Sequence, residues 1–220
     1  MVVAEHSVTI LGRKWLNEEV FELECTRPEG FEFVAGQHVT MRYQEDEREY
    51  TILSPPSADS LLFLIKRIDQ GRLSSILATL DIGGELSISK AMGYLIYRPT
   101  DRPIYFVGTG VGIAPFVSMA RAGVKNFTLL HGAREIAGLF FRQDLMLAAT
   151  RYIPCVSGKL SPETNVIDLH PGYVTDYIDR YVKPGAYDFY LCGSRPMIHD
   201  MTHLLDQHFP ETRIYSEAFN

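Results

Sequence analysis

The stretch GTGVGIAPF, from Gly108 to Phe116, contains residue types that can bind a pyrophosphate. Gly108 and Gly110 stand in G-x-G spacing, and residues without a Cβ atom let backbone N–H groups come close to a phosphate. A helix that begins after these glycines adds partial positive charge at its amino end. Pro115 fits the first turn of such a helix, where its missing N–H removes a donor that has no helical partner. The stretch predicts a nucleotide phosphate site, although a lone G-x-G is equally typical of an ordinary strand-to-helix turn.

A second candidate phosphate site precedes a short predicted helix, Leu73–Leu80. Gly71 stands just before this helix, and Ser74 and Ser75 offer hydroxyl groups in its first turn. Free N–H groups and hydroxyls at the amino end of a helix are suited to phosphate binding. A second site of this kind favours nucleotide binding as the interpretation of both glycine turns.

The predicted strand REYTILS carries a third group of candidate ligands. Because side chains alternate along a strand, Arg48 and Tyr50 share one face and Thr51 points to the other. A guanidinium beside an aromatic ring suits a flat cofactor that carries phosphate, since one group binds the charge and the other stacks on the ring. The alternative interpretation is an ordinary half-buried strand.

These candidates must be positioned by two regions with different hydrophobic patterns. In the first region, short strands alternate with turn-rich stretches, which predicts a small antiparallel β-barrel. Strands are predicted at residues 37–43, 48–54, 61–67 and 85–89, with turns at 46–50 and 54–60.

From residue 99 onward, fully apolar strands alternate with amphipathic helices, which indicates a parallel sheet covered on both faces. Strands are predicted at residues 103–108, 126–134, 151–157 and 187–193, and helices at 116–123, 144–150, 173–182 and 196–209. The linker Tyr97–Pro103 is rich in proline and charge, and it divides the chain into two predicted domains, residues 1–98 and 99–220.

Composition narrows the function classes. The net charge of −6 argues against nucleic acid, because phosphate contacts require clustered Lys and Arg. No apolar run approaches the ~20 residues of a membrane span, and the first residues lack a signal-peptide layout, so a cytoplasmic location is predicted. Three cysteines without a C-x-x-C pair fit neither zinc nor an iron–sulfur cluster. His199 and His203 are interpreted as surface residues, and no metal site is predicted.

Seven motifs, taken in order, resemble a known family. The motifs are REYTILS, IKRIDQGRLSS, SKAMGYL, GTGVGIAPF, HGAR, LCGSRPM and EAF. Their order resembles that of the ferredoxin–NADP⁺ reductase superfamily, and most closely the bacterial ferredoxin (flavodoxin)–NADP⁺ reductases. Each motif is weak alone, but seven in the same order are specific, and the resemblance covers essentially the whole chain.

The resemblance implies an FAD-binding barrel. In that family the strand motif R-x-Y-[ST] binds FAD, so Arg48 is expected at the pyrophosphate, Tyr50 on the isoalloxazine and Thr51 near the flavin N5. The implied FAD-binding residues are Arg48, Tyr50, Thr51, Ile65, Lys66, Gly71, Leu73, Ser74 and Phe219.

The resemblance also implies that the second domain binds NADPH or NADH. The implied nucleotide-binding residues are Gly108, Thr109, Gly110, Gly112, Pro115, Arg134, Ser157, Lys159, Cys192 and Gly193. Members selective for NADPH commonly carry a Ser/Thr-Arg pair where this chain has Ser157 and Gly158, so the choice between NADPH and NADH stays open.

The implied reaction passes a hydride from the nicotinamide to FAD, which then gives electrons singly to a ferredoxin or flavodoxin. Thr51, Cys192 and Glu217 are the implied catalytic residues, acting by position rather than as acids or nucleophiles. A flavin reductase and a reductase subunit of a larger complex remain alternatives, and the oligomeric state is not predicted. A basic docking patch is one interpretation of five cations, and ordinary solvated charge is the other: Lys66, Arg67, Arg72, Lys90 and Arg98.

Overall fold

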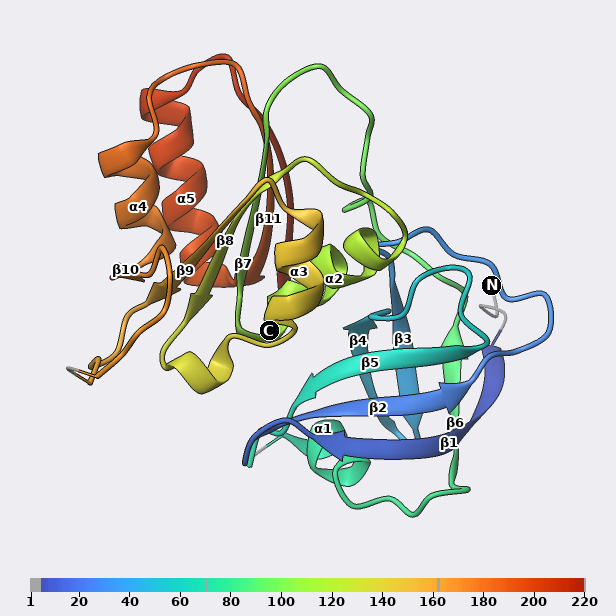
Figure 1. Ribbon diagram of the computed structural model, residues 1–220. Helices are drawn as coiled ribbons and strands as arrows, with labels where there is room; N and C mark the ends of the chain where they lie inside the picture. Colours follow the sequence, from blue (N-terminus) through green and yellow to red (C-terminus); the bar gives the residue numbers. More distant parts are fainter. Residues whose placement is uncertain (1–4, 70, 162, 220) are drawn as a thin grey trace.

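The computed structural model describes residues 5–69, 71–161 and 163–219, and these form two domains that pack against each other (Figure 1). The first domain is a six-stranded antiparallel sheet with one helix. Its elements are β1 (Glu5–Trp15), β2 (Val20–Thr26), β3 (His38–Tyr43), β4 (Asp46–Thr51), β5 (Ser60–Lys66), α1 (Arg72–Leu77) and β6 (Glu85–Ser89).

The sheet of the first domain curls into a barrel. Its strand order is β4-β3-β6-β1-β2-β5. The two outer strands meet where Ile52 bridges Phe63 and the N–H of Leu53 donates to Leu62 O at 2.7 Å. Side chains alternate along each strand, so one set faces the interior and is fully buried, as for Phe21 and Met41. The predicted antiparallel barrel is confirmed.

Some local predictions for the barrel were wrong. The turn expected at residues 46–50 is strand β4, and the chain turns earlier, where Gln44 adopts a φ of 54°. Helix α1 ends at Leu77 rather than Leu80, and the N–H of Thr79 donates to Ile76 O at 2.9 Å, an i→i−3 bond that tightens the turn after the helix.

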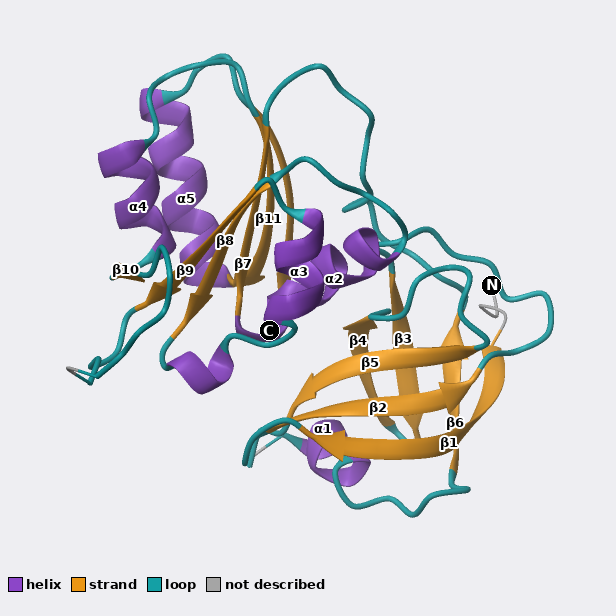
Figure 2. Cartoon of the chain, viewed as in Figure 1, coloured by secondary structure: helices purple, strands orange, loops and turns teal. Residues whose placement is uncertain are grey.

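The second domain is a parallel sheet between two helical layers (Figure 2). Its strand order is β10-β9-β8-β7-β11-β12, and every neighbouring pair is parallel. Its elements are β7 (Ile104–Thr109), η1 (Gly110–Ile113), α2 (Ala114–Arg121), β8 (Thr128–Ala133), η2 (Ile136–Gly138), α3 (Arg142–Ala148), β9 (Arg151–Val156), β10 (His170–Pro171), α4 (Val174–Tyr181), β11 (Asp188–Ser194), α5 (Arg195–His208) and β12 (Arg213–Phe219).

The two faces of this sheet carry separate cores. Helices α2 and α3 cover one face of the sheet, and α4 and α5 cover the other (Figure 1). Phe106 and Tyr190 share a core with residues of α2 and α3, whereas Val107 and Leu191 share a core with residues of α4 and α5. Strands buried on both faces carry nearly continuous apolar runs, which is why the sequence predicts β7, β8, β9 and β11 correctly.

Helix α2 joins the two domains. Phe116 and Met119 of α2 share a continuous buried core with Leu53 and Leu95 of the barrel domain. The buried Ser118 hydroxyl also donates to the barrel carbonyl of Ser54 at 2.8 Å. Apolar burial and a satisfied polar contact at this seam fix how the domains face each other.

The predicted boundary between residues 98 and 99 lies in the segment between the last barrel strand, which ends at Ser89, and β7, which begins at Ile104. The exact division stays a prediction. Among the described residues, no helix is both long enough and apolar enough to cross a membrane.

Candidate functional site

The carboxyl ends of β7 and β11 form a topological switch point. From β7 the chain continues to β8 on one side, and β11 later returns to the other side of β7. Parallel sheets bind ligands in the crevice outside such a point. The predicted nucleotide residues Thr109, Cys192 and Gly193 all lie at these two strand ends.

Two glycines let the β7 and β11 ends approach closely. A Cβ at Gly112 would lie 2.6 Å from both Cys192 O and Gly193 Cα. Gly193 has a φ of 152°, and a Cβ there would collide with Thr109 Oγ1. The atoms that a Cβ at Gly112 would meet belong to the backbone, so no rotamer change can make room for it. At Gly193 the positive φ itself disfavours any other residue.

The other residues of the motif divide between packing and ligand access. A Cβ at Gly108 would lie 2.9 Å from Ile113 Cδ1, so Gly108 allows helix packing. Gly110 has a φ of 57°, and a Cβ there would have no described atom within 4 Å. Gly110 is therefore where the backbone is open to a phosphate. Pro115 lies in the first turn of α2, as predicted.

The three predicted catalytic residues meet at the domain seam, linked by His38. Thr51 ends β4, and its register partner in β3 is His38. The Nδ1 atom of His38 contacts Oε1 of Glu217 in β12. Glu217 is in turn the register partner of Cys192 in β11. The fold thus brings Thr51 of the barrel close to the carboxyl end of β11.

Burial sets the protonation states at the seam. Cys192 is fully buried, and burial together with the charge of Glu217 raises the pKa of its thiol well above the usual value. Cys192 is therefore a neutral thiol at neutral pH. Burial alone would lower the pKa of His38, but the hydrogen bond and charge of Glu217, with the charge of Glu49, raise it overall.

Three buried polar atoms at the seam have no partner in ordinary hydrogen-bond geometry among the described residues. They are the hydroxyl oxygen of Thr51, Oε2 of Glu217, and Nδ1 of His38, which lies in short contact with Oε1 of Glu217. Buried polar groups without partners are costly, and native structures usually satisfy them, often with a ligand or water. A polar heterocycle such as a flavin ring fits this part of the seam.

Arg48 and Tyr50 lie together on β4, beside the amino end of α1. Burial raises the pKa of Tyr50 to about 12, and the nearby charge of Arg48 opposes that shift. Arg48 is exposed, and its Nη1 donates to the carbonyl of Glu47. An ion pair between Arg72 and Asp46 at 3.8 Å holds α1 next to β4. Strand β4, which carries Arg48, and the amino end of α1, which follows Gly71, are thus neighbours, as a shared FAD phosphate site requires.

The side chains of two predicted FAD residues point elsewhere. Ile65 and Leu73 are buried in the barrel core, at 0% and 2% exposure, so only their backbone could meet a cofactor. The Ser74 hydroxyl accepts a hydrogen bond from Ile68 N at 3.1 Å, which shapes the turn before α1. Lys66 is exposed and pairs with Glu19 at 3.0 Å.

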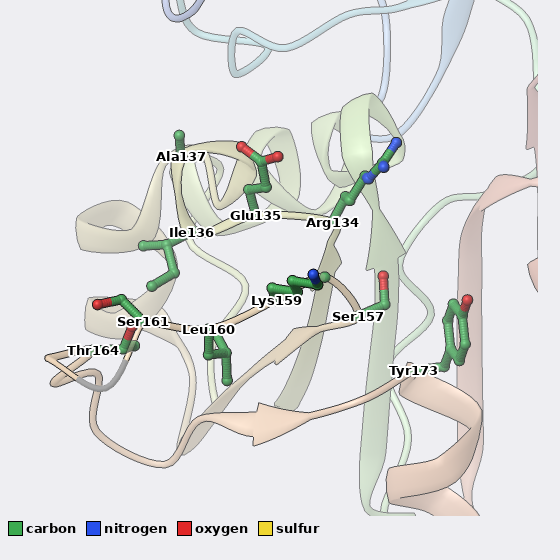
Figure 3. Close-up of a pocket in the computed structure, with 11 residues that line it drawn as sticks. Arg134, Glu135, Ile136, Ala137, Ser157, Lys159, Leu160, Ser161, Thr164 and Tyr173 are labelled. Atoms are coloured by element: carbon green, nitrogen blue, oxygen red, sulfur yellow. The ribbon is translucent and has the colours of Figure 1, made fainter.

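A groove opens at the carboxyl ends of β8 and β9 (Figure 3). It has a volume of about 1100 Å³, and Arg134, Ser157 and Lys159 all line it, as their predicted role requires. Tyr173, at the start of α4, lines the same groove and is 66% exposed. An exposed aromatic ring beside two cations suits a phosphorylated nucleoside.

The backbone at Gly158 explains why this chain lacks an arginine there. Gly158 N donates to Arg134 O at 2.9 Å, and a Cβ at Gly158 would collide with that carbonyl. Any cation for a nucleotide 2′-phosphate must therefore come from Arg134 or Lys159.

Sequence reasoning missed His38 and Tyr173. His38 lies at the start of β3, inside the predicted strand 37–43, and nothing in the local sequence indicates its partner in β12. Tyr173 is the first residue of the predicted helix 173–182, and nothing in the local sequence indicates that it lines the groove. Phe219 ends β12 and pairs with Ser194, and its side chain lies outside the described part of the structure, so its predicted role stays a prediction.

Comparison with known proteins bears directly on both domains. A family model described as an oxidoreductase FAD-binding domain matches residues 15–97, and one described as an oxidoreductase NAD-binding domain matches residues 106–203. Among solved structures, a ferredoxin NADP⁺ reductase from Neisseria gonorrhoeae with bound FAD and NADP superposes with a TM-score of 0.84 at 21% identity. That match covers 96% of this chain and 98% of the other.

Curated relatives are similar along most of this chain. The reductase component of propane 2-monooxygenase from Mycolicibacterium goodii is 25% identical, over 90% of this chain and 62% of that protein. The electron transfer component of toluate 1,2-dioxygenase from Pseudomonas putida is 28% identical, over 85% of this chain and 59% of that protein. The chain thus spans about three-fifths of the length of these relatives.

A barrel domain for FAD followed by a parallel-sheet domain for a nicotinamide nucleotide defines a flavin-dependent oxidoreductase. The chain belongs to the oxidoreductases that join an FAD-binding domain to an NAD-binding domain, and it has the fold of a ferredoxin–NADP⁺ reductase, as its seven motifs predicted.

Proposed function

We propose that this chain takes a hydride from NADH or NADPH onto FAD and passes the electrons singly to a ferredoxin-type protein. The observation that supports this most is the meeting of Thr51, Glu217 and Cys192 at the seam, beside the β7–β11 crevice. When bound, FAD supplies the chemistry, because it accepts a hydride and can release electrons one at a time.

The residues of this chain then orient the flavin and the nicotinamide and exclude water from them. The unpartnered Thr51 hydroxyl is available to hydrogen-bond the flavin edge, while the buried, neutral Cys192 thiol would give the nicotinamide a compact apolar neighbour at the end of β11. Glu217 has one carboxylate oxygen bound by His38 and one without a described partner. Arg48 supplies the positive charge for the FAD pyrophosphate.

The names of the relatives favour an oxygenase system as the physiological setting. They are a reductase component and an electron transfer component of oxygenases. We therefore infer a second candidate function, reductase component of a multi-component oxygenase, which keeps the same hydride step. Flavodoxin stays an alternative acceptor. Because the donor nucleotides are intracellular metabolites, the cytoplasmic location is part of this proposal.

Charge at the surface argues against a uniformly basic docking patch. Lys66 pairs with Glu19, Arg67 with Asp69, and Arg72 with Asp46, at 3.0–3.8 Å. Their positive charge is largely balanced by these neighbours. Docking of an acceptor would then depend on shape near the seam as well as on charge.

Retention of FAD separates an electron-transfer reductase from a flavin reductase. We expect the wild-type protein to keep FAD through gel filtration both before and after reduction by NADH or NADPH. Arg48→Ala should weaken FAD binding about 10- to 100-fold, since charge-assisted hydrogen bonds contribute ~1.5–3 kcal/mol. Arg48→Lys keeps the charge but loses the planar fork, so its affinity should fall between the two. Release of reduced flavin by the wild-type protein would contradict the proposal.

The groove makes a separate prediction about nucleotide choice. Lys159→Ala should raise the Kd for NADPH about tenfold, because the 2′-phosphate loses a charged partner, and should change the Kd for NADH less than twofold. Titration calorimetry with both nucleotides measures this. The control is Lys125→Ala, which changes an exposed lysine just before β8, at the amino ends of the strands and thus at the opposite end of the sheet from the groove. Equal losses for both nucleotides would show that Lys159 does not read the 2′-phosphate.

A further inference from the structure

An ion pair at the domain seam connects β3 of the barrel to β12 of the second domain. His38 lies at the start of β3 in the barrel, and Glu217 lies near the end of β12 in the other domain. The Nδ1 atom of His38 and Oε1 of Glu217 are in direct contact. The His38 side chain is 10% exposed and that of Glu217 is 17% exposed, so solvent screens this pair only weakly.

The backbone around His38 is fixed on two sides. His38 N donates to Met92 O at 2.9 Å, and Met92 N donates to His38 O at 2.8 Å. On the other side, His38 and Thr51 are direct register partners, so their side chains project from the same face of the sheet. The imidazole is therefore attached to backbone held by hydrogen bonds, and it lies on the same face of the sheet as the Thr51 side chain.

The turn after Met92 leaves room for the pair only because it contains glycine. Gly93 has a φ of 102°, and a Cβ there would lie 2.8 Å from His38 Nδ1 and 3.2 Å from Glu217 Oε1. A larger residue would displace both members of the ion pair. The contact is thus part of a built site rather than a chance meeting of surface side chains.

We propose that His38 is a positioning residue that holds Glu217, and with it β12, against the barrel so that the catalytic seam is aligned for hydride transfer. The proposal rests on the function proposed above. It adds a residue outside the set identified from the motifs, and its action passes through Glu217. Its consequence is that the alignment of the seam depends on one buried histidine.

The charges that face His38 determine how the contact depends on pH. Glu217 approaches His38 from β12, and Glu49 approaches it from β4, with Glu49 Oε1 3.8 Å from Nε2. Burial opposes the protonated imidazole, but the two carboxylates raise the pKa of His38 above 6.5. The stabilisation from the pair is fully present below the unfolded pKa and is lost as pH rises through the folded pKa.

Histidine NMR titration of the FAD-loaded protein tests the pair without turnover. We expect the His38 ring signal, assigned by its loss in His38→Asn, to titrate above pH 6.5. Glu217→Gln should lower this pKa. His170 is an internal reference, because burial lowers its pKa and it lies away from Glu217 on β10. A His38 pKa that Glu217→Gln leaves unchanged would overturn the proposal.

Kinetics then tests the role in alignment. His38→Leu should slow reduction of bound FAD about 10- to 100-fold with less than a threefold change in nucleotide Kd, as expected for a misplaced reacting group. His38→Asn keeps a donor near the Nδ1 position and should stay within about threefold of wild type, with a flatter pH profile. If His38→Leu does not fold, the comparison of the pH profiles of wild type and His38→Asn tests the positioning role.

Two results would count against this role. Wild-type rates in His38→Leu, or the same pH profile in wild type and His38→Asn, would overturn the positioning role. Normal His38 titration in a protein whose FAD neither nucleotide reduces would overturn the proposed function instead, and the kinetic role of His38 with it.

Discussion

Thr51→Val is expected to slow the reduction of bound FAD by NADH or NADPH about 100-fold, with FAD still bound. Thr51 is 5% exposed, and its hydroxyl has no partner among the described residues. Valine has the same shape but no hydroxyl, so the change removes only the hydrogen bond that we propose aligns the flavin edge. Misplacement of reacting groups by about 1 Å can cost 100-fold in rate.

Anaerobic stopped-flow absorbance measures this rate directly. Thr51→Ser restores the hydroxyl and should recover most of the rate. Thr150→Val, at an exposed threonine beside the amino end of β9, is the matched control and should react like wild type. Wild-type reduction by Thr51→Val would remove Thr51 from the aligned group.

Gly112→Ala should weaken nucleotide binding by on the order of 100-fold and destabilise the second domain. The new methyl group would lie 2.6 Å from Cys192 O and Gly193 Cα, which are backbone atoms and cannot rotate away. Insertion of a methyl group into a close-packed region typically costs ~1–3 kcal/mol. The β7 turn must then move away from β11, and the crevice for the pyrophosphate and nicotinamide is distorted.

Two measurements separate binding from folding in Gly112→Ala. Calorimetry gives the nucleotide Kd, and urea unfolding gives the free energy of unfolding. Gly12→Ala is the control, because its nearest neighbour, Glu24 Oε2, lies at an ordinary 3.6 Å. If Gly112→Ala binds either nucleotide as wild type does, the close approach of the two strand ends is not needed for the site.

The sequence predicts the second domain more fully than the first. Strand β11 carries a continuous apolar run from Phe189 to Cys192, and that pattern is hard to mistake. Strand β12 was not predicted, because it lies at the sheet edge and its described side chains are only partly buried or exposed. In the barrel, β1 was not located individually, since a bulge between Ile10 and Gly12 interrupts its register.

The predicted site residues lie at the expected strand ends, but sequence spacing did not show where all their side chains point. Ile65 and Leu73 were assigned to FAD binding from the order of the motifs along the chain, but both side chains fill the barrel core. His38 escaped prediction for a different reason. Its partner Glu217 lies at the far end of the chain, and only the packing of the two domains brings them together.

The measurement that tests the central claim most directly is anaerobic stopped-flow reduction of the purified, FAD-loaded protein with NADH and separately with NADPH. The account predicts a yellow protein whose flavin absorption is bleached by at least one nucleotide, followed by recovery of that absorption when an oxidised ferredoxin is added. A protein that does not bind FAD, or bound FAD that neither nucleotide bleaches, would contradict it.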